Sequence, residues 1–385
     1  MKTYCIYKSY KALPKSWDAL VAHDLFLQSD YLQALEEASP QTIQLFYIGV
    51  FSSQKLVGVA VVQRVQLYLK DMFRTRHGAC LKTFFQDSIS KVLKGNILVV
   101  GNLTHTGQHS LFFQNDNITQ SEYLKLIYKA LSDIKKDIKL KQNKTIRAIM
   151  FKDYFIEDSL NLEYEFFNSR CLRKVLVQPN MMLSLRPDWL KKEDYKTSLN
   201  KKYRDRYKRA RKKRNGIVCK ELDLESIKNT SKKLHALYLN VSHNASFNTF
   251  FLPQHHFYTL KQQLKVRFRV FGYYLDDDLI GFYSLILNGN HLETYFLGYN
   301  SKHQLPNQIY LNMLYDMAEF AIEHQFEKVV YARTAMEIKS SVGAKPKAML
   351  MYIKHTNRFV NALLKPIFYV MNPSQDWVER HPFTN

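Results

Sequence analysis

The feature of this 385-residue chain that most constrains its fold is an internal echo between two short segments. Residues 50–61 read VFSSQKLVGVAV, and residues 273–284 read YYLDDDLIGFYS. In both, an apolar run meets a polar turn and returns as Leu-(Val/Ile)-Gly followed by a second apolar run, which predicts a β-hairpin. Gly58 and Gly281 hold the same place in the two copies. Because the copies are separated by more than half of the chain, they predict a tandem duplication of one fold.

The segments around the two hairpins follow one order. Helical spacing of apolar residues covers 26–40 before the first hairpin and 231–244 before the second. Each half then carries a strand, a helix and another strand, at 96–104, 121–139 and 145–155 in the first half and at 291–300, 309–324 and 327–333 in the second. Residues 180–187 read as the first strand of the second half. The sequence therefore predicts an α/β protein with mixed sheets in two tandem domains, 1–175 and 176–385.

The charge of the chain predicts an anionic partner. Lysine and arginine number 56 against 34 acidic residues, a formal net charge of +22. Such a surplus attracts nucleic acid, a phospholipid surface or a phosphate-bearing cofactor. The 46% of apolar residues is typical of a folded globular protein and argues against a disordered chain.

No metal or disulfide framework is expected. The four cysteines lie far apart without a CxxC pair, at positions 5, 80, 171 and 219. His105 and His109 are four residues apart, but Gly107 between them predicts a loop, and no third ligand is apparent.

The location of the protein is predicted from what the sequence lacks. Its first residues have no apolar signal-peptide core, and no run approaches the roughly 18 apolar residues of a membrane span. We expect a cytoplasmic protein and leave peripheral attachment at the inner membrane open. The basic amphipathic segment 353–371 fits either a helix on an anionic bilayer surface or a helix that covers the core.

Several strings carry a family resemblance that spans nearly the whole chain. SLNKKYRDRYKRARKKRNGI (198–217) is similar to an arginine-rich helix followed by glycine, and 305–333 is similar to a Pro-Asn pair before a helix and a strand. GNLTHTGQH (101–109) and residues 333–357 resemble segments of bacterial acyltransferases. Together with the element order, they resemble tandem GCN5-related N-acetyltransferase (GNAT) domains of the Fem-type transferases and related lipid N-acyltransferases. The usual acyl-coenzyme-A fingerprint, (Gln/Arg)-x-x-Gly-x-(Gly/Ala), is absent, so the acyl donor stays open.

Residues 200–214 form the densest cationic segment. Ten cations face the single acid Asp205, and at helical spacing Tyr203, Tyr207 and Ala210 share one face. Such a helix suits phosphates of tRNA, of coenzyme A or of a bilayer, and the alternative is a solvated helix that packs through its tyrosines. The candidate phosphate- or lipid-binding residues are Lys201, Lys202, Arg204, Lys208, Arg211 and Lys212.

The resemblance places the donor at the turn before helix 309–324, because in GNAT folds the donor's pyrophosphate lies there. Pro306 and Asn307 are good helix-start residues, and the amides of a helix start attract anions. The simpler interpretation is that the Pro-Asn pair only begins a helix. The cofactor-binding candidates are Pro306, Asn307, Gln308, Arg333 and Lys339.

Acyl transfer to an amine requires a base, donors for the oxyanion and an acid for the leaving group. Glu293 and Tyr295 share one face of the strand 291–300, which lines the acyl site in GNAT folds. They are the candidate base and its proton-donating neighbour. Tyr331 on the next strand is a candidate acid, with the alternatives that Glu293 is a surface charge and Tyr331 a core residue.

Three functions follow. The leading one is an N-acyltransferase that moves an acyl group from acyl-coenzyme A or an acyl carrier protein to an amine such as a membrane-lipid or sphingoid amine. No cofactor is held permanently, and the first domain is structural. The second is a Fem-type transferase that takes aminoacyl-tRNA and acts on a peptidoglycan precursor. The third is a non-catalytic protein that binds nucleic acid or membranes. The sequence does not predict the oligomeric state.

Overall fold

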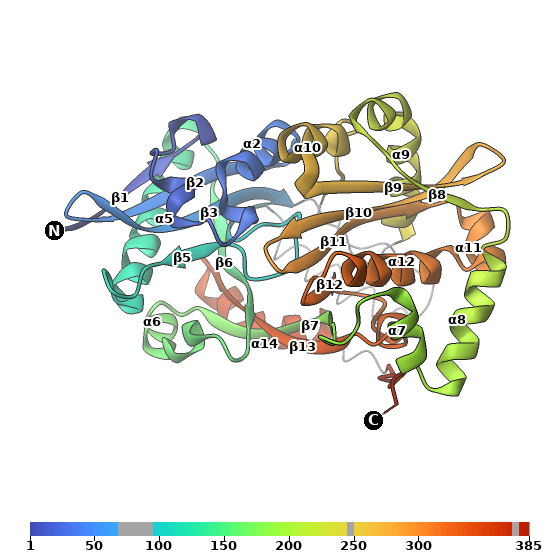
Figure 1. Cartoon of the computed structure of the whole chain (residues 1–385). Coiled ribbons are helices and arrows are strands. Elements are labelled where there is room, and N and C mark those ends of the chain that lie inside the picture. The colour runs from blue at the N-terminus through green and yellow to red at the C-terminus, as the bar shows by residue number, and fades with distance from the viewer. Residues whose placement is uncertain (68–94, 245–249, 372–376, 385) are drawn as a thin grey trace, which may run out of the picture. The chain divides into compact units, whose positions relative to one another are not determined.

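The chain divides into two units, each with a mixed β-sheet, in a computed structural model that describes residues 1–67, 95–244, 250–371 and 377–384 (Figure 1). Unit 1 comprises Met1–Gln178, Ser246–Phe251 and Ala348–Gln375, and unit 2 comprises Pro179–Ala245, Leu252–Lys347 and Asp376–Asn385. The first division, after Gln178, lies close to the predicted boundary at 175. The return of 348–375 to unit 1 was not apparent from the sequence, because it depends on strand pairing between distant segments.

Unit 1 contains a ladder in the order β1-β2-β3-β4-β6-β13. The pairs are antiparallel except for β4 and β6, which are parallel. Its strands are β1 (Lys2–Tyr7), β2 (Ile43–Ser52), β3 (Lys55–Leu67), β4 (Gly95–Val100), β6 (Ile146–Phe155) and β13 (Lys345–His355), with the short β5 (Leu111–Phe113) paired to β3. The first residues of β7 (Arg173–Ser184) also belong to this unit.

The long amphipathic helix α5 packs its apolar side on the sheet of unit 1. Its buried residues recur at helical spacing from Tyr123 to Ile138 and share a core with β2, β3, β4 and β6. In the part of the unit that the structure describes, the helices are α1 (Trp17–Leu20), α2 (Ser29–Glu37), α5 (Gln120–Gln142), α6 (Tyr164–Ser169) and α14 (Arg358–Met371). Residues 353–355 complete β13, so only the later part of the basic segment 353–371 is helical.

Unit 2 repeats the pattern of unit 1 in the order β8-β9-β10-β11-β12-β7. Here β11 and β12 form the single parallel pair, and β7 closes the ladder antiparallel to β12. The strands are β8 (Val218–Glu221), β9 (Phe268–Leu275), β10 (Asp278–Asn288), β11 (His291–Tyr299), β12 (Lys328–Ala332) and the end of β7. Three antiparallel pairs, one parallel pair and one antiparallel pair therefore occur in both units.

Helices cover both faces of the unit 2 sheet. Leu297 belongs to the core beside α8 and α12, whereas its neighbour Gly298 lies against the backbone of α9 at Leu237. Neighbouring strand residues point to opposite faces, so these helices cover opposite sides. The helices of the unit are α7 (Lys192–Ser198), α8 (Lys201–Lys213), α9 (Leu224–Asn244), α10 (His256–Leu264), α11 (Ser301–Asn307), α12 (Ile309–Glu323) and α13 (Met336–Ser340).

The two echoed hairpins are confirmed, and their likeness extends to the backbone. Both two-residue turns have positive φ at each residue, Ser53 and Gln54 in one and Asp276 and Asp277 in the other. Two such residues form the turn that matches the twist of a hairpin. Each hairpin also has a bulge just after its turn: the register skips Val57 between Leu56 and Gly58 in the first and Ile280 between Leu279 and Gly281 in the second. These details support the duplication.

No helix in the described ranges is both long enough and apolar enough to cross a membrane.

Candidate active site

The sheet of unit 2 opens between its two parallel strands. Strands β11 and β12 pair from His291 with Lys328 to Glu293 with Val330. Beyond that point β11 remains paired with β10 as far as Tyr299. Strand β12 meanwhile remains paired with β7 as far as Ala332. The described strands therefore separate after Glu293, and the edge of β11 that faced β12 has no strand partner from there on.

A β-bulge on β11 lies just beyond the point of separation. Thr294 pairs with Leu285 and Leu297 with Tyr283, so Tyr295 and Phe296 together face Ser284 alone. The Ser284 hydroxyl donates to the Phe296 carbonyl at 2.6 Å, which fixes the bulge from the neighbouring strand. Bulges take backbone groups out of the ladder and are frequent beside active sites.

The half-buried Tyr295 contacts His256, the first residue of α10. The Nε2 atom of His256 lies 3.0 Å from the Tyr295 hydroxyl, and the two rings are nearly parallel, with centroids 5.8 Å apart. His256 is completely buried. Sequence reasoning missed His256, because a histidine at the start of a short helix has no spacing that connects it with a strand 39 residues away.

Glu293 is buried, with 2% of its surface exposed, so the alternative of a surface charge is wrong. Alternation along β11 places it on the same side as Tyr295, roughly 6–7 Å along the strand. The structure therefore places Tyr295 beside His256, with Glu293 two residues earlier on the same strand, at the point where the sheet opens.

Tyr331 is a core residue of unit 2. Its hydroxyl donates to the Leu314 carbonyl at 2.7 Å, and burial raises the pKa of Tyr331 well above its usual value. A phenol committed to a helix carbonyl in this way is a poor acid for a leaving group. The geometry corrects the assignment of Tyr331 to catalysis and favours its alternative.

The predicted donor turn differs from the expected loop. Residues 301–307 form the helix α11, with Pro306 inside it and Asn307 as its last residue. Gln308 has a left-handed backbone (φ 48°) and precedes α12 without a side-chain cap. The Asn307 side chain donates to the Lys213 carbonyl at 3.1 Å. Pro306 and Asn307 thus end one helix, and Gln308 alone stands at the start of the next.

Arg333 and Lys339 belong to a tight turn after β12. Ala332, Thr334 and Ala335 all have positive φ, which is uncommon for residues with a side chain. The buried Lys339 ammonium donates to the carbonyls of Ala332 and Arg333 at 3.2 and 2.6 Å. Burial lowers its pKa to about 7. Lys339 therefore holds the turn from inside, which does not fit a cation that projects toward a cofactor phosphate.

The basic helix α8 has the predicted buried face of Tyr203, Tyr207 and Ala210. Arg211, however, is not available for a phosphate. Its guanidinium donates to Asp316 at 2.6 Å and to Glu319 at 2.5 Å, both on α12. Arg204 is partly used as well, because it donates to the Leu199 carbonyl at 2.7 Å. The remaining candidates, Lys201, Lys202, Lys208 and Lys212, are exposed.

The histidine loop lies in unit 1 and follows β4. His109 Nδ1 is 2.8 Å from an Asp24 carboxylate oxygen, and the rings of His105 and His109 have centroids 5.1 Å apart. His105 stacks on Phe26, and burial lowers its pKa well below the usual value.

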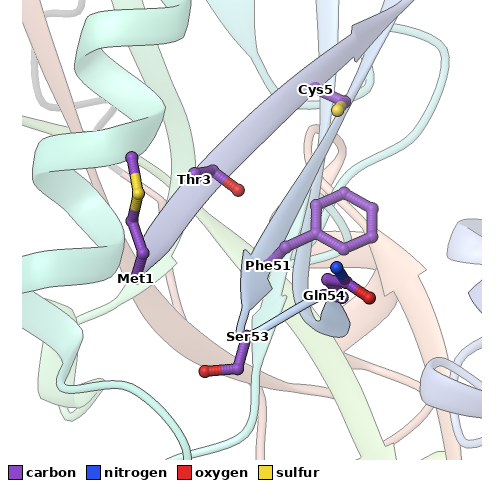
Figure 2. Close-up of a pocket in the computed structure, with 6 residues that line it drawn as sticks. All are labelled: Met1, Thr3, Cys5, Phe51, Ser53 and Gln54. Atoms are coloured by element: carbon purple, nitrogen blue, oxygen red, sulfur yellow. The ribbon is translucent and has the colours of Figure 1, made fainter.

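A pocket of about 540 Å³ in unit 1 is formed by other residues. Figure 2 shows its lining, which comes from β1, from β2 and from the turn that follows β2: Met1, Thr3, Cys5, Phe51, Ser53 and Gln54. None of these is a predicted site residue.

Solved structures identify the fold. No family model matches the chain. No curated protein matches it either. FemX is similar over 94% of this chain and 99% of its own, with a TM-score of 0.55 and 11% identity. A tandem GNAT protein from the clavulanic acid biosynthesis pathway is similar over 93% of this chain and 99% of its own, with a TM-score of 0.53 and 11% identity. The chain has a tandem GNAT fold. In this chain, β11, β12 and α12 are the elements on which the resemblance placed the acyl site.

Proposed function

We propose that unit 2 of this tandem GNAT protein transfers an acyl group from a thioester to an amine. The observation that carries the proposal is the separation of β11 from β12 after Glu293 and Val330. Backbone N–H and C=O groups along an open strand edge need partners. An extended arm that contains amides can supply them by pairing as an added strand. The thioester at the end of such an arm would then lie near the bulge.

The bulge supplies the means to stabilise a developing negative charge. Phe296 lies in the bulge, and a backbone N–H that a bulge takes out of the ladder can donate to the oxyanion of a tetrahedral intermediate. Ser284 holds the carbonyl of Phe296, so that the bulge is fixed before the substrate arrives.

The proton transfers fall to Glu293 and Tyr295. The carboxylate of Glu293 takes a proton from the ammonium of the acceptor, and the neutral amine attacks the thioester carbonyl. The C–N bond forms, and the C–S bond breaks as the departing thiolate takes the phenolic proton of Tyr295. The resulting tyrosinate takes the second proton from the nitrogen of the new amide, which restores Tyr295. Glu293 then releases its proton to water, so that one proton leaves for each amide formed. His256 positions the Tyr295 hydroxyl for this step.

The co-substrate would be acyl-coenzyme A or an acylated carrier protein, with no cofactor held permanently. We extend the proposal to a lipid amine as acceptor, since the net charge of +22 favours an anionic membrane surface.

The experiment is a transfer assay that reads product mass. Acyl-coenzyme A of several chain lengths is offered with a panel of amines that includes a sphingoid base. The wild type is compared with Glu293→Gln and with Glu323→Gln, an exposed carboxylate at the end of α12. We expect transfer by the wild type and the control variant and its loss in Glu293→Gln. Absence of any product, or full activity of Glu293→Gln, would overturn the proposal.

The likeness to FemX favours a second candidate, aminoacyl transfer from tRNA to a peptidoglycan precursor. It keeps the site in unit 2 and replaces the thioester by an aminoacyl ester. Binding of tRNA measured over a salt series tests it, because phosphate contacts give a steep loss of affinity as salt rises. Transfer from aminoacyl-tRNA, with none from acyl-coenzyme A, would decide for this candidate.

A further inference from the structure

The outer side of α8 is a continuous cationic surface. At 100° per residue its six exposed cations and Asp205 fall within an arc of about 140°, opposite the buried side of Tyr203, Tyr207 and Ala210. We call these six residues the cationic arc: Lys201, Lys202, Lys208, Arg209, Lys212 and Lys213.

Unit 2 neutralises two inner cations of this helical segment, Arg211 and Arg214, but not the arc. Arg211 pairs with Asp316 and Glu319, and Arg214 pairs with Asp316 at 3.0 Å. Within the described part of the chain, no member of the arc forms an ion pair. Like charges at this density repel one another, so an acidic partner would gain most by docking here.

The arc ends beside the proposed donor site. The last turn of α8 is tied to the start of α12, since Asn312 donates to the Ala210 carbonyl at 2.9 Å, and to the end of α11, since Asn307 donates to the Lys213 carbonyl at 3.1 Å. Helix α11, which Figure 1 shows beside α8, connects the end of β11 to α12. A partner on the arc would therefore sit next to the segment that leads to the open edge of β11.

Two kinds of anionic partner fit this surface poorly. An amphipathic helix enters a bilayer through its apolar side, but the apolar side of α8 is in the core of unit 2. An A-form RNA has a major groove that is deep and narrow, so a convex helix could follow only one line of phosphates. A small acidic protein has neither restriction, since its helix can lie along the arc over about 20 Å.

We infer that the cationic arc docks an acidic carrier protein that delivers the acyl group as a thioester on a flexible arm. This inference rests on the proposed function, because the arm has a purpose only if unit 2 accepts a thioester. Charge complementarity would orient the carrier and speed its encounter. The arm would then extend past α11 toward the open edge of β11.

A binding experiment with a matched control tests the inference. The probe is a purified acyl carrier protein in its acylated form, titrated calorimetrically at two salt concentrations. The arc variant is Lys208→Glu with Lys212→Glu, and the control is Lys228→Glu with Lys232→Glu. Both pairs are exposed, four residues apart on helices of unit 2, and change the charge equally. We expect the arc variant to bind about tenfold more weakly and the control within about twofold of the wild type.

The outcomes separate the docking surface from the chemistry. No binding of the carrier, or equal loss in both variants, overturns the inference, and transfer from acyl-coenzyme A would leave the proposed function standing. Binding that depends on the arc without transfer from either thioester supports docking and removes the proposed function. Affinity for tRNA or for vesicles of phosphatidylglycerol that falls in the arc variant, while the carrier does not bind, would assign the arc to that polyanion instead.

Discussion

In unit 1, the parallel strands β4 and β6 stay paired to the last residue of β4, from Asn96 with Ile146 to Val100 with Phe151. In unit 2, the equivalent strands β11 and β12 part after Glu293 and Val330, although β11 continues to Tyr299. The two sheets share order and direction of strands, so this difference arose within one architecture. In unit 1 the strand that runs on past the last parallel pair is the second one, β6, which ends at Phe155, whereas in unit 2 it is the first one, β11.

The two units also differ at the start of the helix that follows the first strand of each parallel pair. Helix α5 of unit 1 begins with a capping box, in which Thr119 and Glu122 bond to each other's backbone N–H groups. The start of α12 in unit 2 has no such cap at Gln308. A carboxylate of unit 1 therefore occupies the place where an anionic ligand would meet a helix start. Both differences support the proposal that the ligand site lies in unit 2.

The largest effect that would test this comparison is the loss of transfer on replacing Glu293 by glutamine. The amide keeps the size of the side chain but cannot take a proton from the acceptor. We expect the rate of transfer to fall by about 10²- to 10⁴-fold, measured by product mass under single-turnover conditions. Urea unfolding of the same variant serves as the control for folding. If Glu293→Gln transfers the acyl group at the normal rate, Glu293 is not the base, and the open strand edge of unit 2 no longer marks the catalytic site through this residue.

A second test concerns the strand ends that follow each parallel pair. In unit 1 the end of β6 carries the ion pair of Lys152 with Asp153, whereas in unit 2 Lys339 donates to two carbonyls. Burial lowers the pKa of Lys339 from 10.5 to about 7. Between these values the unfolded chain binds the extra proton, so stability rises with pH across this window and is lost as pH falls toward 7.

Lys339→Met removes this dependence. We expect the difference in the free energy of unfolding, wild type minus variant, to increase by about 4 kcal/mol between pH 7 and pH 10.5. Urea unfolding of both proteins at several pH values measures the difference, in which the other titrating groups cancel. If the free energies of unfolding of the two proteins change with pH in parallel, burial does not lower the pKa of Lys339.

The architecture was predictable from the sequence because it depends on local patterns. The hairpins, the strands of the parallel pairs and the helices α5 and α12 follow from periodicity, from turn residues and from the positions of Gly58 and Gly281. The helix at 301–307 was missed, because Pro306 indicated a helix start and lies inside a helix instead.

The site was only partly predictable, since it depends on contacts between distant segments. Glu293 and Tyr295 follow from strand alternation, but His256 reaches Tyr295 only through packing of α10 on the sheet. The role of Arg211 depends on acids of α12 that lie about a hundred residues away. No sequence pattern connects His256 with Tyr295, or Arg211 with the acids of α12, because these residues are far apart in the chain.

The equivalent glycines give a third, smaller contrast between the units. A Cβ at Gly58 would lie 2.7 Å from the Tyr123 ring of α5, which stacks on Phe113 and cannot move away. A Cβ at Gly281 would meet the flexible end of Met313 on α12 at 2.9 Å. We expect Gly58→Ala to lower the free energy of unfolding by about 2–3 kcal/mol and Gly281→Ala by less than about 1 kcal/mol. Equal losses in thermal or urea unfolding would contradict this contrast between the two helix–sheet contacts.

The smallest effect sharpens the contrast between the two helix starts. Thr119 caps α5, so Thr119→Ala should destabilise the protein by about 1 kcal/mol. Gln308 before α12 has a left-handed backbone that costs a residue with a side chain roughly 1 kcal/mol and costs glycine little. Gln308→Gly should therefore stabilise the fold by up to about 1 kcal/mol.

Measured together by urea unfolding, the two substitutions should have opposite signs although they occupy equivalent helix starts. Opposite signs would mean that unit 1 optimised its helix start for stability, whereas unit 2 keeps a strained residue there. Strain that persists beside a proposed ligand site is expected where function, rather than stability, maintains the residue. If Gln308→Gly also destabilises the protein, contacts of the Gln308 side chain offset the backbone strain. The start of α12 would then be as well stabilised as the start of α5.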